Sequence, residues 1–180
     1  MTGIREYNTQ RTCGVWLVYI GVIVIVSALL GGDLLIQPLV LGIGYFVGFL
    51  LILVFPFVNR KLAYGKSTKF QDRMDNIAIV LNVVLCTACG LLIGFENVRL
   101  FWLSIFIVVG VHFFGFYFSQ GRSMIVLGLL TVVNGLLGLV LIGVPFIVFA
   151  LLDGGLKLLV GLKMFTMKRE VNVPSEHLFS

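Results

Sequence analysis

Residues 14–30 read GVWLVYIGVIVIVSALL, an apolar run without a single charged side chain. An α-helix needs about 20 such residues to span the hydrocarbon core of a bilayer, within a range of roughly 17–25. Only helices and closed barrels satisfy their backbone polar groups in lipid, and these continuous runs lack the alternation of barrel strands. The fold class is therefore predicted as an all-α integral membrane protein. Its six transmembrane helices are expected at residues 14–30, 34–58, 77–95, 100–118, 124–143 and 144–167.

The overall composition supports this prediction and excludes a large soluble domain. The 180 residues are 59% hydrophobic and 12% charged, with a mean hydropathy of +1.11. Soluble domains carry about 25% charged residues, and a short soluble fold buries only about two-thirds of its chain surface. No long polar segment interrupts the apolar runs. We therefore expect a single transmembrane domain over residues 1–180, with lipid as its natural solvent.

Lysine and arginine are distributed unequally between the segments that connect the predicted helices. One face of the membrane would carry ten of them, whereas the opposite face would carry only Arg99. Cytoplasmic loops carry the excess of Lys and Arg in membrane proteins. This asymmetry predicts a multi-pass protein of the cell membrane with both termini in the cytoplasm. The cytoplasmic segments would be the tail 1–13, the basic loop 59–76 and the tail 168–180.

The formal net charge of +5 does not indicate a nucleic-acid partner. The basic residues cluster in short connections, and no basic helix with interleaved aromatics stands free of the apolar runs. That arrangement lacks the electrostatic footprint of a nucleic-acid-binding surface. The expected partners are the lipid bilayer and, where the chain assembles, a second copy or another membrane protein.

The ends of the first, third and fifth predicted helices resemble one another. They read SALLGG at residues 27–32, CGLLIG at 89–94 and GLVLIG at 138–143. Each has a small residue five positions before a terminal glycine, and small residues let helices approach closely in lipid. The pattern predicts three tandem helical hairpins in one bundle. The alternative is that abundant glycine and leucine produce the similarity by chance.

This hairpin pattern, together with the closing segment ALLDGGLKLLVG at residues 150–161, resembles the HdeD family of bacterial membrane proteins. The resemblance covers residues 14–165. It implies a six-helix inner-membrane protein associated with acid resistance, without established catalytic residues. The long basic connection at 59–76 departs from the compact pattern of that family.

A small set of polar side chains falls inside the predicted helices. At about 1.5 Å of rise per residue, Asn134 and Asp153 would lie near the middle of the bilayer, with Asn82, His112 and Lys157 in its inner half. Ionisable residues at this depth are costly and often functional. A His–Asp–Asn group is chemically suited to relay a proton or a cation, because histidine titrates near neutral pH. We predict that His112 and Asp153 face the bundle interior and interact, directly or through Asn134 or a water.

The alternative interpretation of this cluster is structural. Asp153 and Lys157 are four residues apart, so on one helix they can pair with each other. Lys157 can also extend its stem toward the interface. Asn82 and Asn134 can hydrogen-bond between helices, which contributes about 0.6 kcal/mol each.

Cys86 and Cys89 form a C-x-x-C pair inside the third predicted helix. Membrane enzymes that make disulfides use such a pair with a second pair on the outer side, whereas Cys13 lies at the inner end of the first helix. A packing role is preferred, because Cys89 occupies the small-residue position of the repeat and free cysteine behaves as a small hydrophobe. No phosphate-binding or hydrolase motif is present, and no cofactor or metal is predicted.

Three classes of function remain open. The preferred one is a non-enzymatic stress-response or accessory membrane protein, which predicts a dry, closed bundle. The first alternative is a small transporter or channel that uses the His/Asp polar cluster, and it predicts a cavity reaching that cluster. The second alternative is a membrane thiol redox enzyme using Cys86 and Cys89, which requires the two sulfurs within bonding distance beside a pocket.

Overall fold

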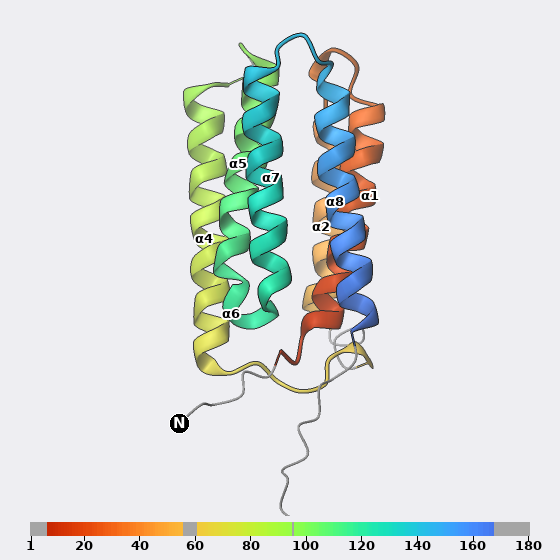
Figure 1. Cartoon of the computed structure of the whole chain (residues 1–180), viewed down its shortest axis with the longest axis vertical. Coiled ribbons are helices and arrows are strands. Elements are labelled where there is room, and N and C mark those ends of the chain that lie inside the picture. The colour runs from red at the N-terminus through yellow and green to blue at the C-terminus, as the bar shows by residue number, and fades with distance from the viewer. Residues whose placement is uncertain (1–6, 56–60, 95, 168–180) are drawn as a thin grey trace, which may run out of the picture.

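The computed structural model describes residues 7–55, 61–94 and 96–167, and within these ranges the secondary structure is helical, without strands (Figure 1). α2 (Pro38–Gly48) continues into a π-helical segment, η2 (Phe49–Val54). Two short elements, η1 (Gly32–Leu34) and α6 (Tyr117–Gln120), lie in connections. The long helices are α1 (Gln10–Leu29), α4 (Lys69–Leu92), α5 (Val98–Gly115), α7 (Arg122–Val140) and α8 (Phe146–Thr166).

Four of these helices, α1, α4, α5 and α7, are long and apolar enough to cross a membrane. Residues 38–54 form a shorter apolar helix. α8 is 21 residues long, but Asp153, Lys157 and Lys163 lie along it. The all-helical fold predicted from the apolar runs is thus confirmed for the part of the chain that the structure describes.

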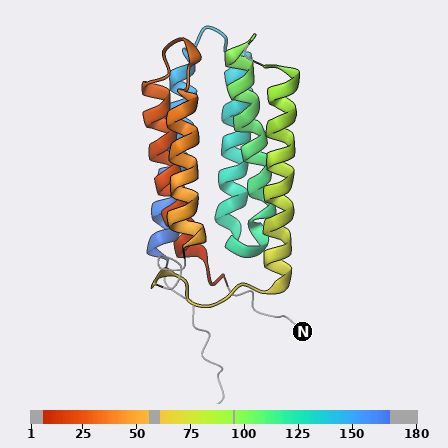
Figure 2. The ribbon, with the colours of Figure 1, turned by 180° about the vertical axis from the view of Figure 1, so that it is seen from behind.

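The long helices run side by side and separate into two groups (Figures 1 and 2). α1, α2 and α8 form the group called the α1 half, and α4, α5 and α7 form the α5 half. The most extensive packing lies within the halves, between α1 and α8 and between α5 and α7. The main helix–helix contact between the halves joins α7 to α8.

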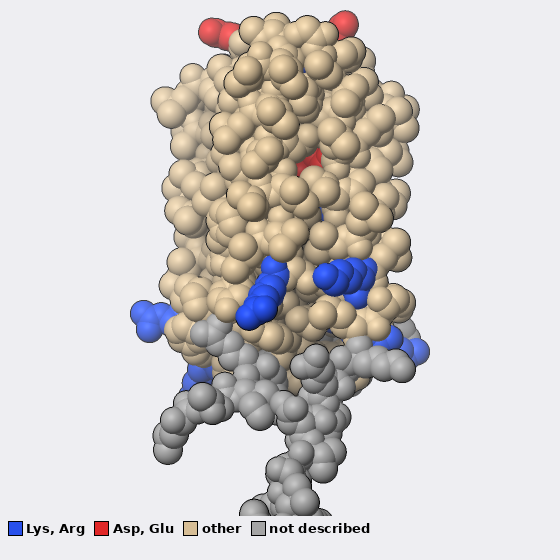
Figure 3. All heavy atoms as spheres, viewed as in Figure 1, with Lys and Arg blue, Asp and Glu red and all other residues tan. Residues whose placement is uncertain are grey.

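The charged side chains mark the two ends of the bundle. α1 begins and α8 ends at the same end, at the bottom of Figure 1. Figure 3 shows Lys and Arg side chains gathered toward this end, acidic side chains at the other end, and between them a broad belt that is uncharged apart from a small acidic patch. The two ends are called the basic end and the opposite end below.

Glycine pairs bring the backbones of α1 and α8 into direct contact. A Cβ atom on Gly14 would lie 2.7 Å from the carbonyl oxygen of Gly161, and one on Gly21 would lie 2.8 Å from that of Gly154. The reverse distances, from Gly161 to Gly14 and from Gly154 to Gly21, are 2.7 and 2.9 Å. The glycines are spaced by seven residues, or nearly two helical turns, on each helix, so both fall on one face. This α1–α8 seam fixes the register of the two helices.

α5 and α7 form a second seam of the same kind. A Cβ atom on Gly110 would lie 3.0 Å from the carbonyl oxygen of Gly128, and one on Gly128 would lie 2.7 Å from that of Gly110. Farther along α7, a Cβ on Gly135 would lie 3.1 Å from the carbonyl oxygen of Leu103. Each half is therefore held by close backbone contact.

Two predicted boundaries need correction, because helices extend into segments expected to be loop or tail. α4 begins at Lys69, so the basic loop predicted at 59–76 ends at Thr68. Thr68 Oγ1 accepts from the backbone N–H of Gln71 at 3.2 Å, and Gln71 Oε1 accepts from the N–H of Thr68 at 2.9 Å. This capping box starts the helix before its apolar part. α1 likewise begins at Gln10, inside the predicted tail 1–13.

The starts of the other helices lie closer to the predicted positions. The second predicted helix starts at Pro38 rather than at residue 34, because proline at the first helical position loses no hydrogen bond. α5, α7 and α8 begin within two residues of their predicted starts. The predicted end of the second helix at 56–58, the predicted end of the third at 95 and the tail 168–180 lie outside the described residues.

The turns at the opposite end share only part of the predicted repeat. Gly32 and Gly94 have φ of 52° and 58°, in the left-handed region that favours glycine. Gly143 does not adopt this conformation. Its turn is held instead by Arg99, whose guanidinium donates to the carbonyl oxygens of Val144, Gly138 and Leu141 at 2.9, 2.9 and 3.1 Å.

Candidate functional site

A cavity of about 480 Å³, called the central cavity, lies between the two halves. α1 and α2 line one side, α4 and α5 line the other, and α8 contributes two residues. Most of the lining is apolar or aromatic. Small-molecule pockets enclose about 300–1,000 Å³ and combine such a lining with a few convergent polar groups. The polar residues singled out from the sequence that line this cavity are Asn82, Cys86, His112, Asp153 and Lys157.

The cavity exists because α2 and α4 line it without packing closely on each other. α2 packs mainly on α1, and α4 packs mainly on α5. Only 6% of the apolar window of α4 is buried, which is far less than for α1, α5 or α7. The side of the central cavity between α2 and α4 is therefore its least covered side.

Asp153 and Lys157 form a buried ion pair at the central cavity. The Lys157 ammonium donates to Oδ2 of Asp153 from four residues along α8. The two residues are only 1% and 3% exposed. Oδ1 of Asp153 has no hydrogen-bond partner among the residues that the structure describes. The Lys157 ammonium also lies 5.8 Å from the ring centroid of Phe113 on α5.

His112 and Asp153 do not hydrogen-bond directly among the described residues, so the direct form of the predicted interaction needs correction, whereas contact through a water stays a prediction. The local Lys157 partner pairs with Asp153 instead, because side chains four apart on a helix meet without any rearrangement of helices. His112 Nδ1 lies 2.7 Å from the carbonyl oxygen of Val109. A carbonyl only accepts, so Nδ1 carries the hydrogen and Nε2 of the neutral ring is an acceptor. His112 still lines the same cavity as Asp153.

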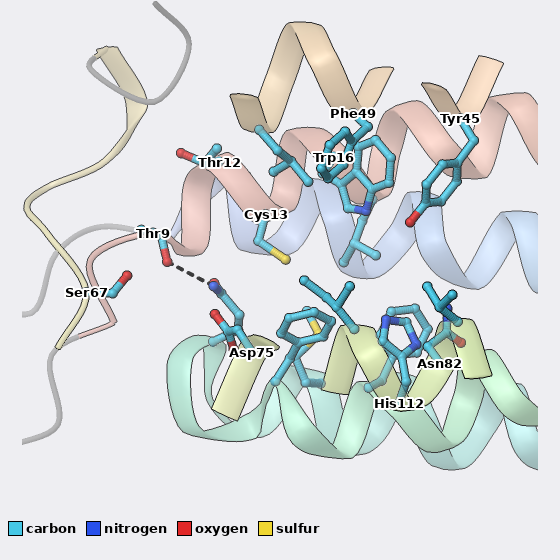
Figure 4. Close-up of a pocket in the computed structure, with 18 residues that line it drawn as sticks. Thr9, Thr12, Cys13, Trp16, Tyr45, Phe49, Ser67, Asp75, Asn82 and His112 are labelled. Carbon is cyan, nitrogen blue, oxygen red and sulfur yellow. Dashed lines mark hydrogen bonds between the residues drawn. The ribbon is translucent and has the colours of Figure 1, made fainter. Parts of the chain in front are cut away.

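A second cavity, of about 260 Å³ and called the basic-end cavity, adjoins the first. The two share Trp16, Tyr45, Asn82 and His112 in their linings. In Figure 4, Trp16 and Tyr45 project from one wall and Asn82 and His112 from the opposite wall. Toward the basic end its lining becomes more polar, with Thr9, Thr12, Ser67, Asp75 and Gln120. The shared lining places the basic-end cavity next to the central cavity, on the side of the basic end.

Hydrogen bonds between the halves close the bundle near both ends. Near the basic end, Gln120 Nε2 donates to Thr9 Oγ1 at 2.9 Å, as drawn in Figure 4, and Gln10 Nε2 donates to the carbonyl oxygen of Gln120 at 2.7 Å. Near the opposite end, Trp102 Nε1 donates to the carbonyl oxygen of Leu34 at 2.9 Å. These hydrogen bonds accompany two buried hydrophobic clusters that contain residues of both halves, one with Ile36 and Phe106 and the other with Leu17 and Phe113.

The remaining predicted residues take separate positions. Asn134 Nδ2 donates to the carbonyl oxygen of Phe149 at 2.9 Å, so it joins α7 to α8 as the structural interpretation expected. Cys86 Sγ lies 3.7 Å from Oδ1 of Asn82, one turn earlier on α4. Cys86 and Cys89 are both free thiols, and Cys89 does not line either cavity.

Sequence reasoning missed several residues of the site. Asp75 accepts a 2.6 Å hydrogen bond from Ser119 and lines the basic-end cavity, although its position was assigned to the basic loop. The Thr68-x-x-Gln71 capping signal would have placed it on a helix. No sequence signal identified Trp16 and Tyr45, because aromatic residues in apolar helices usually face lipid or neighbouring helices.

Comparison with known proteins places the chain in a family. No curated protein and no solved structure matches it. Residues 2–174 match the family described as "Family of unknown function (DUF6609)". That match covers nearly the whole chain, and the protein therefore belongs to the DUF6609 family.

Proposed function

We propose that this chain is a small membrane transporter that moves an amphipathic solute through the central cavity. The observation that supports the proposal is a cavity of about 480 Å³ that is lined by a buried Asp–Lys pair and adjoins a second cavity toward the basic end. Unfilled apolar volume costs stability. A bundle that served only as an anchor would gain by filling this space, whereas a solute-binding protein requires it.

We propose that six helices cross the membrane as three tandem hairpins of one domain. These helices are α1, α2 with η2, α4, α5, α7 and α8. Residues 38–54 lie at the short end of the spanning range. α8 is counted although it contains Asp153 and Lys157, because the two charges pair and are buried away from lipid.

The arrangement of the halves supports alternating access to the cavity. The two glycine seams favour movement of each half as one body, since bound backbones resist separation. The cavity lies between these bodies, and rocking would change the hydrogen bonds at each end together with the hydrophobic contacts that the two halves share.

The proposal predicts that the middle of the cavity is reached by water from both faces of the membrane. Asn82→Cys, in a chain whose native cysteines are replaced by serine, is expected to react with an impermeant cationic thiosulfonate in right-side-out and in inside-out vesicles. Val80→Cys is the matched control, because Val80 lies two residues away on the same helix, is 62% exposed on the apolar surface and lines neither cavity. Reaction of Asn82→Cys from neither face would rule out transport through this cavity.

We further propose that the basic end is cytoplasmic and that the protein lies in the cell membrane, because Lys and Arg accumulate on cytoplasmic segments. In intact cells, Lys66→Cys is expected to resist an impermeant maleimide, whereas Asp33→Cys at the opposite end should be labelled. Both positions are exposed, so accessibility within the protein does not bias the comparison. Labelling of Lys66→Cys without labelling of Asp33→Cys would show that the basic end faces outward, which contradicts the proposed topology.

The two other classes of function stay predictions. The HdeD resemblance implies an accessory role in acid stress, and the family match adds no function to it. A thiol redox role would use Cys86, which lines the central cavity beside Asn82. Replacing Cys89, which lines neither cavity, with serine is expected to leave transport intact and to abolish any redox activity that needs the Cys86–Cys89 pair.

A further inference from the structure

We infer that the central cavity binds an amphipathic ammonium ion, a protonated amine on an aromatic body, in exchange for one proton of Lys157. This inference rests on the proposed transporter function and names its substrate class. It begins with the unmatched acceptor at the cavity. Oδ1 of Asp153 is buried and lacks a hydrogen-bond partner within the described part of the chain, while Oδ2 accepts from Lys157. An N–H or O–H donor of a ligand satisfies such an oxygen, and a positively charged N–H donor binds a carboxylate most strongly.

The shape and lining of the cavity indicate the rest of the ligand. Trp16, Tyr45, Trp102, Phe106 and Phe113 line its walls. Aromatic faces attract cations, and they also accept flat apolar bodies. Lys157 already uses this property, since its ammonium lies 5.8 Å from the centroid of the Phe113 ring. A volume of about 480 Å³ accommodates an amine carried on one or two rings.

Charge balance requires that a proton leaves when the ammonium ion enters. Asp153 and Lys157 are the charged residues that line the central cavity, and their charges cancel. A second cation would leave a net positive charge inside the membrane, which is unfavourable. Deprotonation of Lys157 restores neutrality, because the carboxylate of Asp153 then pairs with the ligand.

The exchange involves one bond and no electron transfer. The Nζ–H bond of Lys157 that faces Asp153 breaks, its electron pair stays on Nζ, and the proton leaves through the basic-end cavity. The ligand keeps all of its hydrogens. One positive charge enters the site and one leaves, so the charge of the site is unchanged.

The other titratable groups around the pair are few. On α7, which packs on α8, the buried polar residues Thr131 and Asn134 carry no titratable group. His112 lines both cavities, and its Nε2 is an acceptor on the way to the basic end. The remaining titratable residues that line the two cavities are Cys13 on α1, Tyr45 on α2 and Asp75 and Cys86 on α4.

Isothermal titration of the purified full chain in detergent tests the inference with matched ligands. Tryptamine supplies an indole body with an ammonium group, and tryptophol supplies the same body with a hydroxyl group. Titration in two buffers of different ionisation enthalpy measures the number of protons released. We expect tryptamine to bind with one proton released, and its apparent affinity to rise about tenfold per pH unit because each binding event releases one proton. Tryptophol is expected to bind at least tenfold more weakly, without proton release.

Asp153→Asn is expected to weaken tryptamine binding at least a hundredfold. The double variant Asp153→Asn, Lys157→Gln removes both charges and so leaves no unpaired lysine. We expect this variant to fold and still not to bind tryptamine, which would attribute the loss of binding to the missing carboxylate rather than to misfolding. Equal binding of tryptophol, or preferential binding of zwitterionic tryptophan, would overturn the ammonium inference and leave the cavity as a solute site. Binding of none of these ligands would overturn it as well, whereas the proposed transporter function is decided by the Asn82→Cys labelling.

Discussion

Replacing Asp153 with leucine is expected to lower the free energy of unfolding by about 3–5 kcal/mol. The change leaves the Lys157 side chain, which is 3% exposed, without its carboxylate partner. Breaking a buried pair from one side costs this much because the surviving charge stays desolvated. Reversible unfolding in mixed detergent micelles, followed by circular dichroism, measures the difference.

The double variant Asp153→Leu, Lys157→Leu is the decisive comparison. It removes both charges and fills their space with apolar atoms, so we expect stability close to that of the unchanged protein or up to about 4 kcal/mol higher. Lys163→Leu is the control for loss of a lysine on the same helix, because Lys163 is exposed. A double variant as unstable as Asp153→Leu would contradict the description of these residues as one ion pair.

Replacing Gly161 with valine is expected to prevent stable packing of α1 on α8. A Cβ atom there would lie 2.7 Å from the carbonyl oxygen of Gly14 and 2.8 Å from the backbone nitrogen of Val18. Overpacking a core commonly costs about 1–3 kcal/mol when side chains can shift. These contacts are with backbone atoms, so the helices must separate along the seam, and the cost should exceed that range.

Gly155→Val on the same helix provides the matched control, because nothing lies within 4 Å of a Cβ atom built on Gly155. Size-exclusion chromatography and thermal unfolding of both variants measure the effect. We expect aggregation or a greatly lowered Tm for Gly161→Val and nearly unchanged behaviour for Gly155→Val. Similar behaviour of the two variants would mean that helix propensity, rather than the seam, determines the result.

The helices themselves were predictable from the sequence, because each long apolar run must satisfy its backbone internally. This reasoning depends on local composition, and it identified α1, α5, α7 and α8 with small errors at their ends. It failed at the start of α4, where the charged turn Lys69–Arg73 looked like loop. The Thr68–Gln71 capping box stabilises helix there independently of hydropathy.

The identity of the helix pairs was decided by tertiary structure. The sequence pattern emphasised consecutive helices, whereas the most extensive contacts join α1 to α8 and α5 to α7. Glycines were recognised as packing residues, but their partners are far apart in the chain. Which glycine faces which depends on the rotation of each helix about its axis, and an all-round apolar helix does not encode that rotation in its hydropathy.

The polar residues inside the helices also have some contacts that follow from the sequence and others that follow only from the tertiary structure. That Asp153 and Lys157 can pair follows from their spacing of four on one helix, and the sequence alone determined this geometry. The sequence did not determine that His112 hydrogen-bonds to Val109 of its own helix, or that Tyr45 and Trp16 lie on the opposite wall of the cavity from His112. Both features depend on the separation of α2 from α4. The cavity arises where two packed halves fail to fill the space between them, and such a volume is a property of the assembled bundle rather than of any segment.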